Sequence, residues 1–136
     1  MSERKQAPIE DRAGIYPEQE LTGAILKAAF TVHNTLGAGF LEKVYANALS
    51  LELQAARIRC EQELPLKVHY RGVVIGDYVA DLIVERRVLI ELKAVAALDP
   101  AHEAQLMNYL RASGIRVGLL LNFGRPKLYY KRFIWG

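Results

Sequence analysis

The most informative segment of the chain is Tyr78-Val-Ala-Asp-Leu-Ile-Val-Glu-Arg-Arg-Val-Leu-Ile-Glu-Leu-Lys93. It belongs to two runs rich in β-branched residues, 73–84 and 88–95, which are separated by the polar triplet 85–87. Two such runs joined by a short polar segment are typical of a β-hairpin. A preceding alternating run, 63–70, adds a further strand, so the sequence predicts a three-stranded antiparallel meander.

Three charged residues lie inside these apolar runs. If the triplet forms a three-residue loop, Val84 pairs with Val88, and Asp81 lies opposite Glu91. Lys93 is two residues beyond Glu91 and projects from the same face. Unpaired charges in apolar strands would cost several kcal/mol. Two interpretations follow: a buried network in which the lysine neutralises a carboxylate, or a site for a hard divalent cation, Mg²⁺ or Mn²⁺, with oxygen ligands.

The remaining elements are predicted from periodicity and from helix caps. The expected order is a polar, flexible lead-in over 1–16, helices over 17–36 and 40–56, the three-stranded meander, a helix over 100–113, and strands over 117–123 and 128–135. Residues 17–136 then form one domain. The expected buried stripe of the second helix comprises Leu41, Val44, Ala48 and Leu51. Three tyrosines, Tyr16, Tyr70 and Tyr78, are expected in the core.

Composition narrows the class of protein. The chain has 136 residues, of which 51% are hydrophobic and 24% charged, which excludes a disordered chain and a disulfide scaffold. The single cysteine, Cys60, cannot form an internal bridge, so a cytoplasmic setting is expected. The sequence contains no apolar stretch long enough to cross a membrane. A secreted or membrane-spanning protein is therefore not expected.

The net charge of +3 is unevenly distributed. Residues 116–136 contain five basic and no acidic residues, together with five of the twelve aromatic ones. Such a segment suits either a nucleic-acid surface or an edge strand with one solvated face. Charge and composition alone favour the edge strand.

The spacing of the embedded charges resembles that of the PD-(D/E)xK nuclease superfamily. Asp81 is followed ten residues later by Glu91-Leu-Lys93 across a predicted hairpin. The conventional proline before the aspartate is Ala80 here. The resemblance implies an α/β fold with a mixed sheet: a restriction-endonuclease-like αβββαβ core, with an extra N-terminal helix and a C-terminal strand.

Further motifs resemble a narrower family of small bacterial proteins, the GxxExxY family. Gly39-Phe-Leu-Glu-Lys-Val-Tyr45 spells the motif. The segments 32–37, 105–110 and 118–124 also fit, in the same order, so the resemblance covers about residues 18–134.

This resemblance implies a site and an activity. Asp81, Glu91 and the backbone carbonyl of Leu92 would hold one or two Mg²⁺ or Mn²⁺ ions, and Lys93 would position the attacking water. Glu42 would add a carboxylate near the metal, although an acidic residue in a first helical turn is favoured by the helix dipole in any case. Asp81, Glu91, Lys93 and Glu42 are thus the expected catalytic set. Tyr45 is expected to pack with a hydrogen bond, or else to orient Glu42. His33 is expected to cap the end of the first helix, or else to face the cleft, and His102 is expected to be a bystander.

The expected partner is nucleic acid, DNA in preference to RNA. Gln105 and Tyr109 share a helix face and would steady the strand, unless they are a boundary residue and a packed tyrosine. The basic residues expected to guide the phosphate backbone are Arg125, Lys127, Lys131 and Arg132. The alternative is a catalytically silent nuclease fold that binds nucleic acid or a protein. A chain of this length also favours a homodimer or a partner protein.

Overall fold

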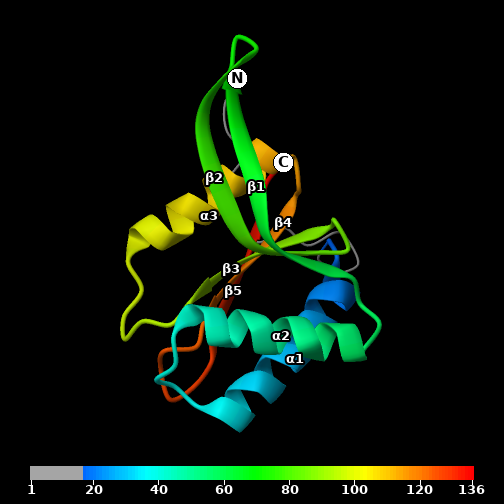
Figure 1. Cartoon of the computed structure of the whole chain (residues 1–136), viewed down its shortest axis with the longest axis vertical. Coiled ribbons are helices and arrows are strands. Elements are labelled where there is room, and N and C mark those ends of the chain that lie inside the picture. Colours follow the sequence, from blue (N-terminus) through cyan, green and yellow to red (C-terminus); the bar gives the residue numbers. More distant parts are fainter. Residues whose placement is uncertain (1–16) are drawn as a thin grey trace.

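A computed structural model describes residues 17–136, so the expectations for residues 1–16, including Tyr16, lie outside the described part. The elements follow the expected order: α1 (Gln19–Leu36), α2 (Glu42–Ala55), β1 (Cys60–Tyr70), β2 (Val73–Val84), β3 (Val88–Lys93), α3 (Pro100–Ser113), β4 (Val117–Asn122) and β5 (Tyr129–Ile134) (Figure 1). The described helices include none that is both long and apolar enough to cross a membrane.

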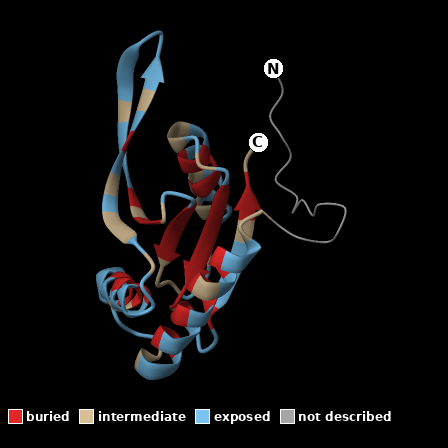
Figure 2. Cartoon of the chain, turned by 90° about the vertical axis from the view of Figure 1, so that its right-hand side faces the viewer, coloured by how far each residue is buried: buried red, intermediate tan, exposed pale blue. Residues whose placement is uncertain are grey.

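The strands form one mixed sheet in the order β1-β2-β3-β4-β5. Neighbouring strands are antiparallel except β3 and β4, which are parallel and are joined by the crossover helix α3. Helices α1 and α2 pack on one face of the sheet, and α3 packs on the other. Figure 2 shows the buried centre of the sheet between these helical layers. The predicted mixed α/β fold is confirmed.

Covering on both faces explains why β4 is apolar. All six of its residues are buried, as expected for a strand with helices on either side. Gly118 allows α3 to approach closely, because a Cβ at this position would lie 3.0 Å from Leu106 of that helix. The start of α3 is held by a capping box, in which Asp99 accepts from the Ala101 amide and His102 accepts from the Asp99 amide.

The predicted buried face of α2 is wrong. Leu41 is 79% exposed and Leu51 66% exposed, and Val44 also faces solvent. The buried residues are instead Tyr45, Ala46, Leu49, Ser50 and Leu53. Both sets recur at helical spacing, so periodicity cannot choose between them. The choice is made by Tyr45, whose ring stacks on Phe123 at a centroid distance of 4.7 Å.

The outer parts of β1 and β2 form a two-stranded arm that projects beyond the helices (Figures 1 and 2). The expectation that Tyr70 and Tyr78 lie in the core is therefore wrong, since they are 60% and 46% exposed. Their strand pattern predicted pairing correctly. That pattern did not show that the helices cover only the inner parts of β1 and β2.

Candidate functional site

The site begins where β2 separates from β3. The Val84–Val88 pairing predicted from a three-residue loop is found, but Leu82–Ile90 is the last pair of the ladder, so the predicted Asp81–Glu91 pair is not part of it. One step further, Oδ2 of Asp81 accepts a hydrogen bond from the Leu92 amide at 2.7 Å. Glu63 of β1, in the adjacent part of the arm, adopts a left-handed backbone conformation. A carboxylate thus takes the place of a backbone acceptor at the point where the arm diverges from the sheet.

Glu91 is the most buried charged group of the site. Only 4% of the residue is exposed, and one of its oxygens, Oε2, lies 3.4 Å from the ammonium of Lys93. The other oxygen, Oε1, is buried and has no hydrogen-bond partner among the described residues. Buried polar atoms without partners are rare, and each one calls for a water, a proton or an ion at that position.

The pKa shifts of Glu91 and Asp81 agree with this geometry. Burial, and then the charge of Asp81, raise the pKa of Glu91 to about 7, against the opposing effect of Lys93. Burial also raises the pKa of Asp81, although the bond from the Leu92 amide opposes the shift. The repulsion between two neighbouring carboxylates can be removed either by a proton that they share or by a cation. The structure therefore brings together the three charged residues that the sequence singled out.

Helix α3 places Tyr109 beside the two carboxylates. The tyrosine is 5% exposed, and its hydroxyl accepts a hydrogen bond from Nε2 of Gln105 at 3.0 Å. Burial, followed by the charges of Glu91 and Asp81, raises the pKa of Tyr109. The predicted Gln105–Tyr109 face is thus a hydrogen-bonded pair next to the carboxylates, and its contact with nucleic acid stays a prediction.

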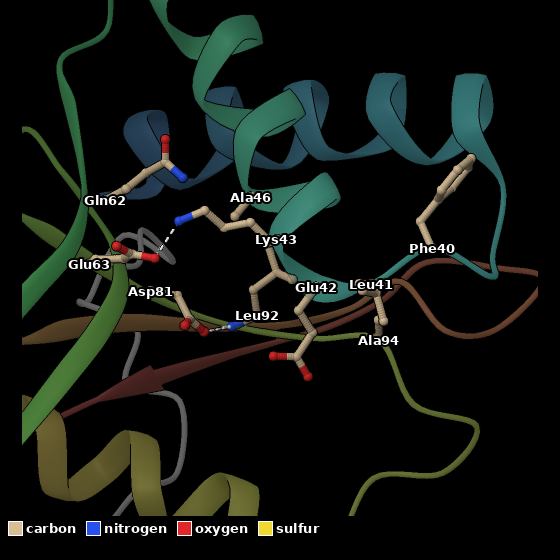
Figure 3. Close-up of a pocket in the computed structure, with 10 residues that line it drawn as sticks. All are labelled: Phe40, Leu41, Glu42, Lys43, Ala46, Gln62, Glu63, Asp81, Leu92 and Ala94. Atoms are coloured by element: carbon tan, nitrogen blue, oxygen red, sulfur yellow. Dashed lines mark hydrogen bonds and ion pairs between the residues drawn. The ribbon is translucent and has the colours of Figure 1, made fainter.

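A cavity of about 500 Å³ opens between α2 and the base of the arm, with Asp81 on its wall. Figure 3 shows Glu42 reaching into the same region from the start of α2, and the charge of Glu42 helps to raise the pKa of Asp81. Within residues 17–136, no three or more acidic, histidine or cysteine side chains converge closely enough to hold a metal ion. The role of Glu42 as a ligand therefore stays a prediction.

The oxygen atoms of Asp81, Glu91 and the Leu92 carbonyl are ligands that suit a small, hard cation. Mg²⁺ usually binds proteins through one or two carboxylates and keeps several waters. Asp81 and Glu91 provide two carboxylates, one with an unpartnered oxygen. Because the amide and carbonyl of one strand residue point toward the same neighbouring strand, the carbonyl of Leu92 is directed toward the same gap as its amide.

The structure does not gather the four predicted C-terminal cations onto one surface. Lys131 forms an ion pair with Glu103 of α3 at 3.1 Å, whereas Nε of Arg132 donates to the Thr22 hydroxyl of α1. Adjacent strand residues project to opposite faces, so these two cations lie on different sides of the sheet. Arg125 and Lys127 lie in the turn before β5. Contact of these residues with nucleic acid stays a prediction.

Asn122, for which the sequence predicts no role, anchors the chain beyond Lys93. The fully buried amide of Asn122 accepts from the amides of Val95 and Gly124 and donates to the Val95 carbonyl, each at 3.0 Å. Its sequence signal is a polar side chain at the end of an otherwise apolar strand. Position 124 requires glycine, because a Cβ there would lie 2.3 Å from the Val95 nitrogen.

Two residues with expected structural roles make hydrogen bonds to loop backbone. The hydroxyl of Tyr45 donates to the Gly37 carbonyl and accepts from the Phe40 amide, which holds the loop between α1 and α2. Nε2 of His33 lies 2.8 Å from the carbonyl of Arg125. Both residues therefore support the loops around the site.

Comparison with known families identifies the class. The model of the PD-(D/E)XK nuclease superfamily matches residues 19–133. The chain therefore belongs to the PD-(D/E)XK nuclease superfamily, and its mixed sheet is the restriction-endonuclease-like fold.

A solved structure, the crystal structure of SSO0001, shares this fold with a TM-score of 0.53 and 18% sequence identity. The alignment covers 86% of this chain and 59% of that one, so the chain spans about three-fifths of the length of that protein. Among curated proteins, none matches significantly.

Proposed function

We propose that this protein is a Mg²⁺- or Mn²⁺-dependent nuclease that hydrolyses phosphodiester bonds of DNA, with RNA as the alternative substrate, and that it belongs to the GxxExxY group within the superfamily. The observation that carries the proposal is the unpartnered buried oxygen of Glu91 beside Asp81. A buried carboxylate pair in this family's fold is best explained by a divalent cation that neutralises it.

The residues of the site would have different roles. Asp81, Glu91 and the Leu92 carbonyl would hold the ion, and Glu42 would approach from α2. The ion would supply charge stabilisation at the phosphate and a bound water of lowered pKa. Lys93, held 3.4 Å from Glu91, directs its ammonium toward the same place, where it can orient the attacking water and stabilise negative charge on the phosphate.

The residues of α3 would hold the nucleic-acid strand in place and would take no direct part in the reaction. The hydrogen bond between Gln105 and Tyr109 fixes both side chains before a substrate arrives. A fixed polar pair beside the carboxylates can steady the strand that is cleaved, because the cost of ordering these side chains is met in the free protein.

A cleavage assay tests the proposal. The purified protein is incubated with single-stranded DNA, duplex DNA and RNA in Mg²⁺ or Mn²⁺, beside Asp81→Asn and Lys93→Ala. We expect cleavage by the wild type and a loss of at least about a hundredfold in either variant. If every substrate stays intact, or if Lys93→Ala cleaves as well as the wild type, the proposal is wrong.

Calorimetric titration with Mn²⁺ separates a nuclease from a silent binding module. We expect the wild type to bind the ion and Asp81→Asn to bind it much more weakly. Absence of binding to the wild type, or equal binding to both proteins, would favour a module that binds nucleic acid or a protein without cleaving.

A further inference from the structure

The cavity beside Asp81 is acidic and has a single cation. Its charged lining consists of Glu42, Glu63 and Asp81 against one lysine, Lys43. A phosphate backbone that approaches such a cavity is repelled unless positive charge is supplied at the entrance. A metal ion at the carboxylates would compensate part of this charge, and Lys43 is the cation on the rim.

Lys43 lies in the first turn of α2 and reaches β1, where its ammonium forms an ion pair with Glu63. Figure 3 shows this pair near Asp81 among the residues that line the cavity, with Lys43 next in sequence to Glu42. The side chains of Lys43 and Glu63 are 56% and 61% exposed. Solvent-exposed pairs of this kind contribute little to stability, so the lysine can exchange its partner readily.

We infer that Lys43 is a phosphate-binding residue for the strand that enters the site, and that Glu63 competes with the substrate for it. The inference rests on the proposed function for the identity of the phosphate, which is that of a nucleic-acid backbone. In the free protein Glu63 holds the ammonium at the rim. On binding, a phosphate oxygen replaces the carboxylate oxygen, and Glu63 turns to solvent.

This exchange predicts opposite effects for the two members of one ion pair. Lys43→Gln removes the phosphate contact, so affinity for nucleic acid falls, by about tenfold for one charge-assisted contact. Glu63→Gln removes the competitor, so affinity rises, by about threefold for an exposed ion pair. Because a single phosphate contact is lost, Lys43→Gln also lowers the slope of log K against log salt by about 0.7 for single-stranded DNA.

The experiment measures the fluorescence anisotropy of a labelled single-stranded DNA 20-mer over a range of salt concentrations. All variants carry Asp81→Asn, which removes cleavage by the proposed mechanism. The double variant Lys43→Gln/Glu63→Gln is decisive: if Glu63 acts through Lys43, Glu63→Gln has no effect once the lysine is gone. A general effect of charge would instead be additive.

The chain offers a matched control in a second exposed ion pair. Lys67 and Asp77 lie 2.9 Å apart on the arm, with side chains 57% and 72% exposed. We expect Lys67→Gln and Asp77→Asn to change DNA affinity by less than about twofold, because this pair does not line the cavity of Asp81. Urea unfolding confirms that each variant is folded.

Additive effects of Lys43→Gln and Glu63→Gln, equal effects at the control pair, or no DNA binding at all would overturn the inference. The proposed nuclease activity is judged separately, from cleavage by proteins that retain Asp81. Lysine-dependent binding without cleavage would refute the proposed function and leave the inference standing. If Lys43→Gln cleaves DNA with an unchanged KM, the proposed function stands and the inference about Lys43 is refuted.

Discussion

Glu91 should make the stability of the metal-free protein fall as pH rises. Its pKa lies near 7 in the folded protein, against an ordinary value of 4.5. Between these values the folded protein keeps a proton that the unfolded chain releases. Raising the pH through this window therefore favours the unfolded chain, and above about pH 7 no further loss comes from this group.

The magnitude follows from the difference between the two pKa values. A shift of about 2.5 units at 1.36 kcal/mol per unit corresponds to about 3 kcal/mol of stability lost between pH 4.5 and pH 7. The ion pair with Lys93 is already included in this value, because it acts on the same titration. Glu91→Gln keeps the size of the side chain and removes the titration.

Urea unfolding in EDTA at several pH values between 4.5 and 8 tests this reasoning. We expect the stability of Glu91→Gln relative to the wild type to rise by up to about 3 kcal/mol across that range. Saturating Mn²⁺ should reverse the trend in the wild type, since the ion binds the deprotonated carboxylate, and should do so much less in the variant. A stability difference that is the same at every pH would refute the burial argument for Glu91.

Three further substitutions test the packing that supports the site, each by urea unfolding. Asn122→Ala should cost about 3 kcal/mol, because it removes a buried side chain and leaves the partly buried backbone groups of Val95 and Gly124 without that partner; a loss below about 1 kcal/mol would show that those groups find other partners. Gly124→Ala should cost about 3 kcal/mol or more, since its Cβ would overlap the Val95 backbone; a neutral result would contradict that close approach. Tyr45→Phe should cost about 1–2 kcal/mol, because it loses the hydroxyl bonds to Gly37 and Phe40 and keeps the ring stack; unchanged stability would mean that water replaces both bonds.

Local patterns predicted the elements well, because strand alternation and helix caps act over a few residues. The Asp99-Pro100 start of α3 is an example, since a cap and a proline determine a helix end with little help from the rest of the chain. The β2–β3 register is another, because only a short loop separates the strands and its length sets the pairing.

The same patterns failed where a choice depended on distant residues. Helix α2 has apolar residues on two faces, and its burial against Phe123, a residue of the far end of the chain, selects one of them. The arm is a regular hairpin in sequence, and its exposure depends on where the helical layers end. Neither fact is encoded within the segment concerned.

The sequence by itself determined the charged core of the site. Asp81, Glu91 and Lys93 lie on two strands joined by three residues, so the hairpin places all three just beyond the last pair of the β2–β3 ladder. The tertiary structure decided what surrounds them: the unpartnered oxygen of Glu91, the Asn122 anchor, the approach of Glu42, and the Lys43–Glu63 pair on the rim. These depend on how helices and strands pack across the sheet, and such contacts join residues that no local pattern relates.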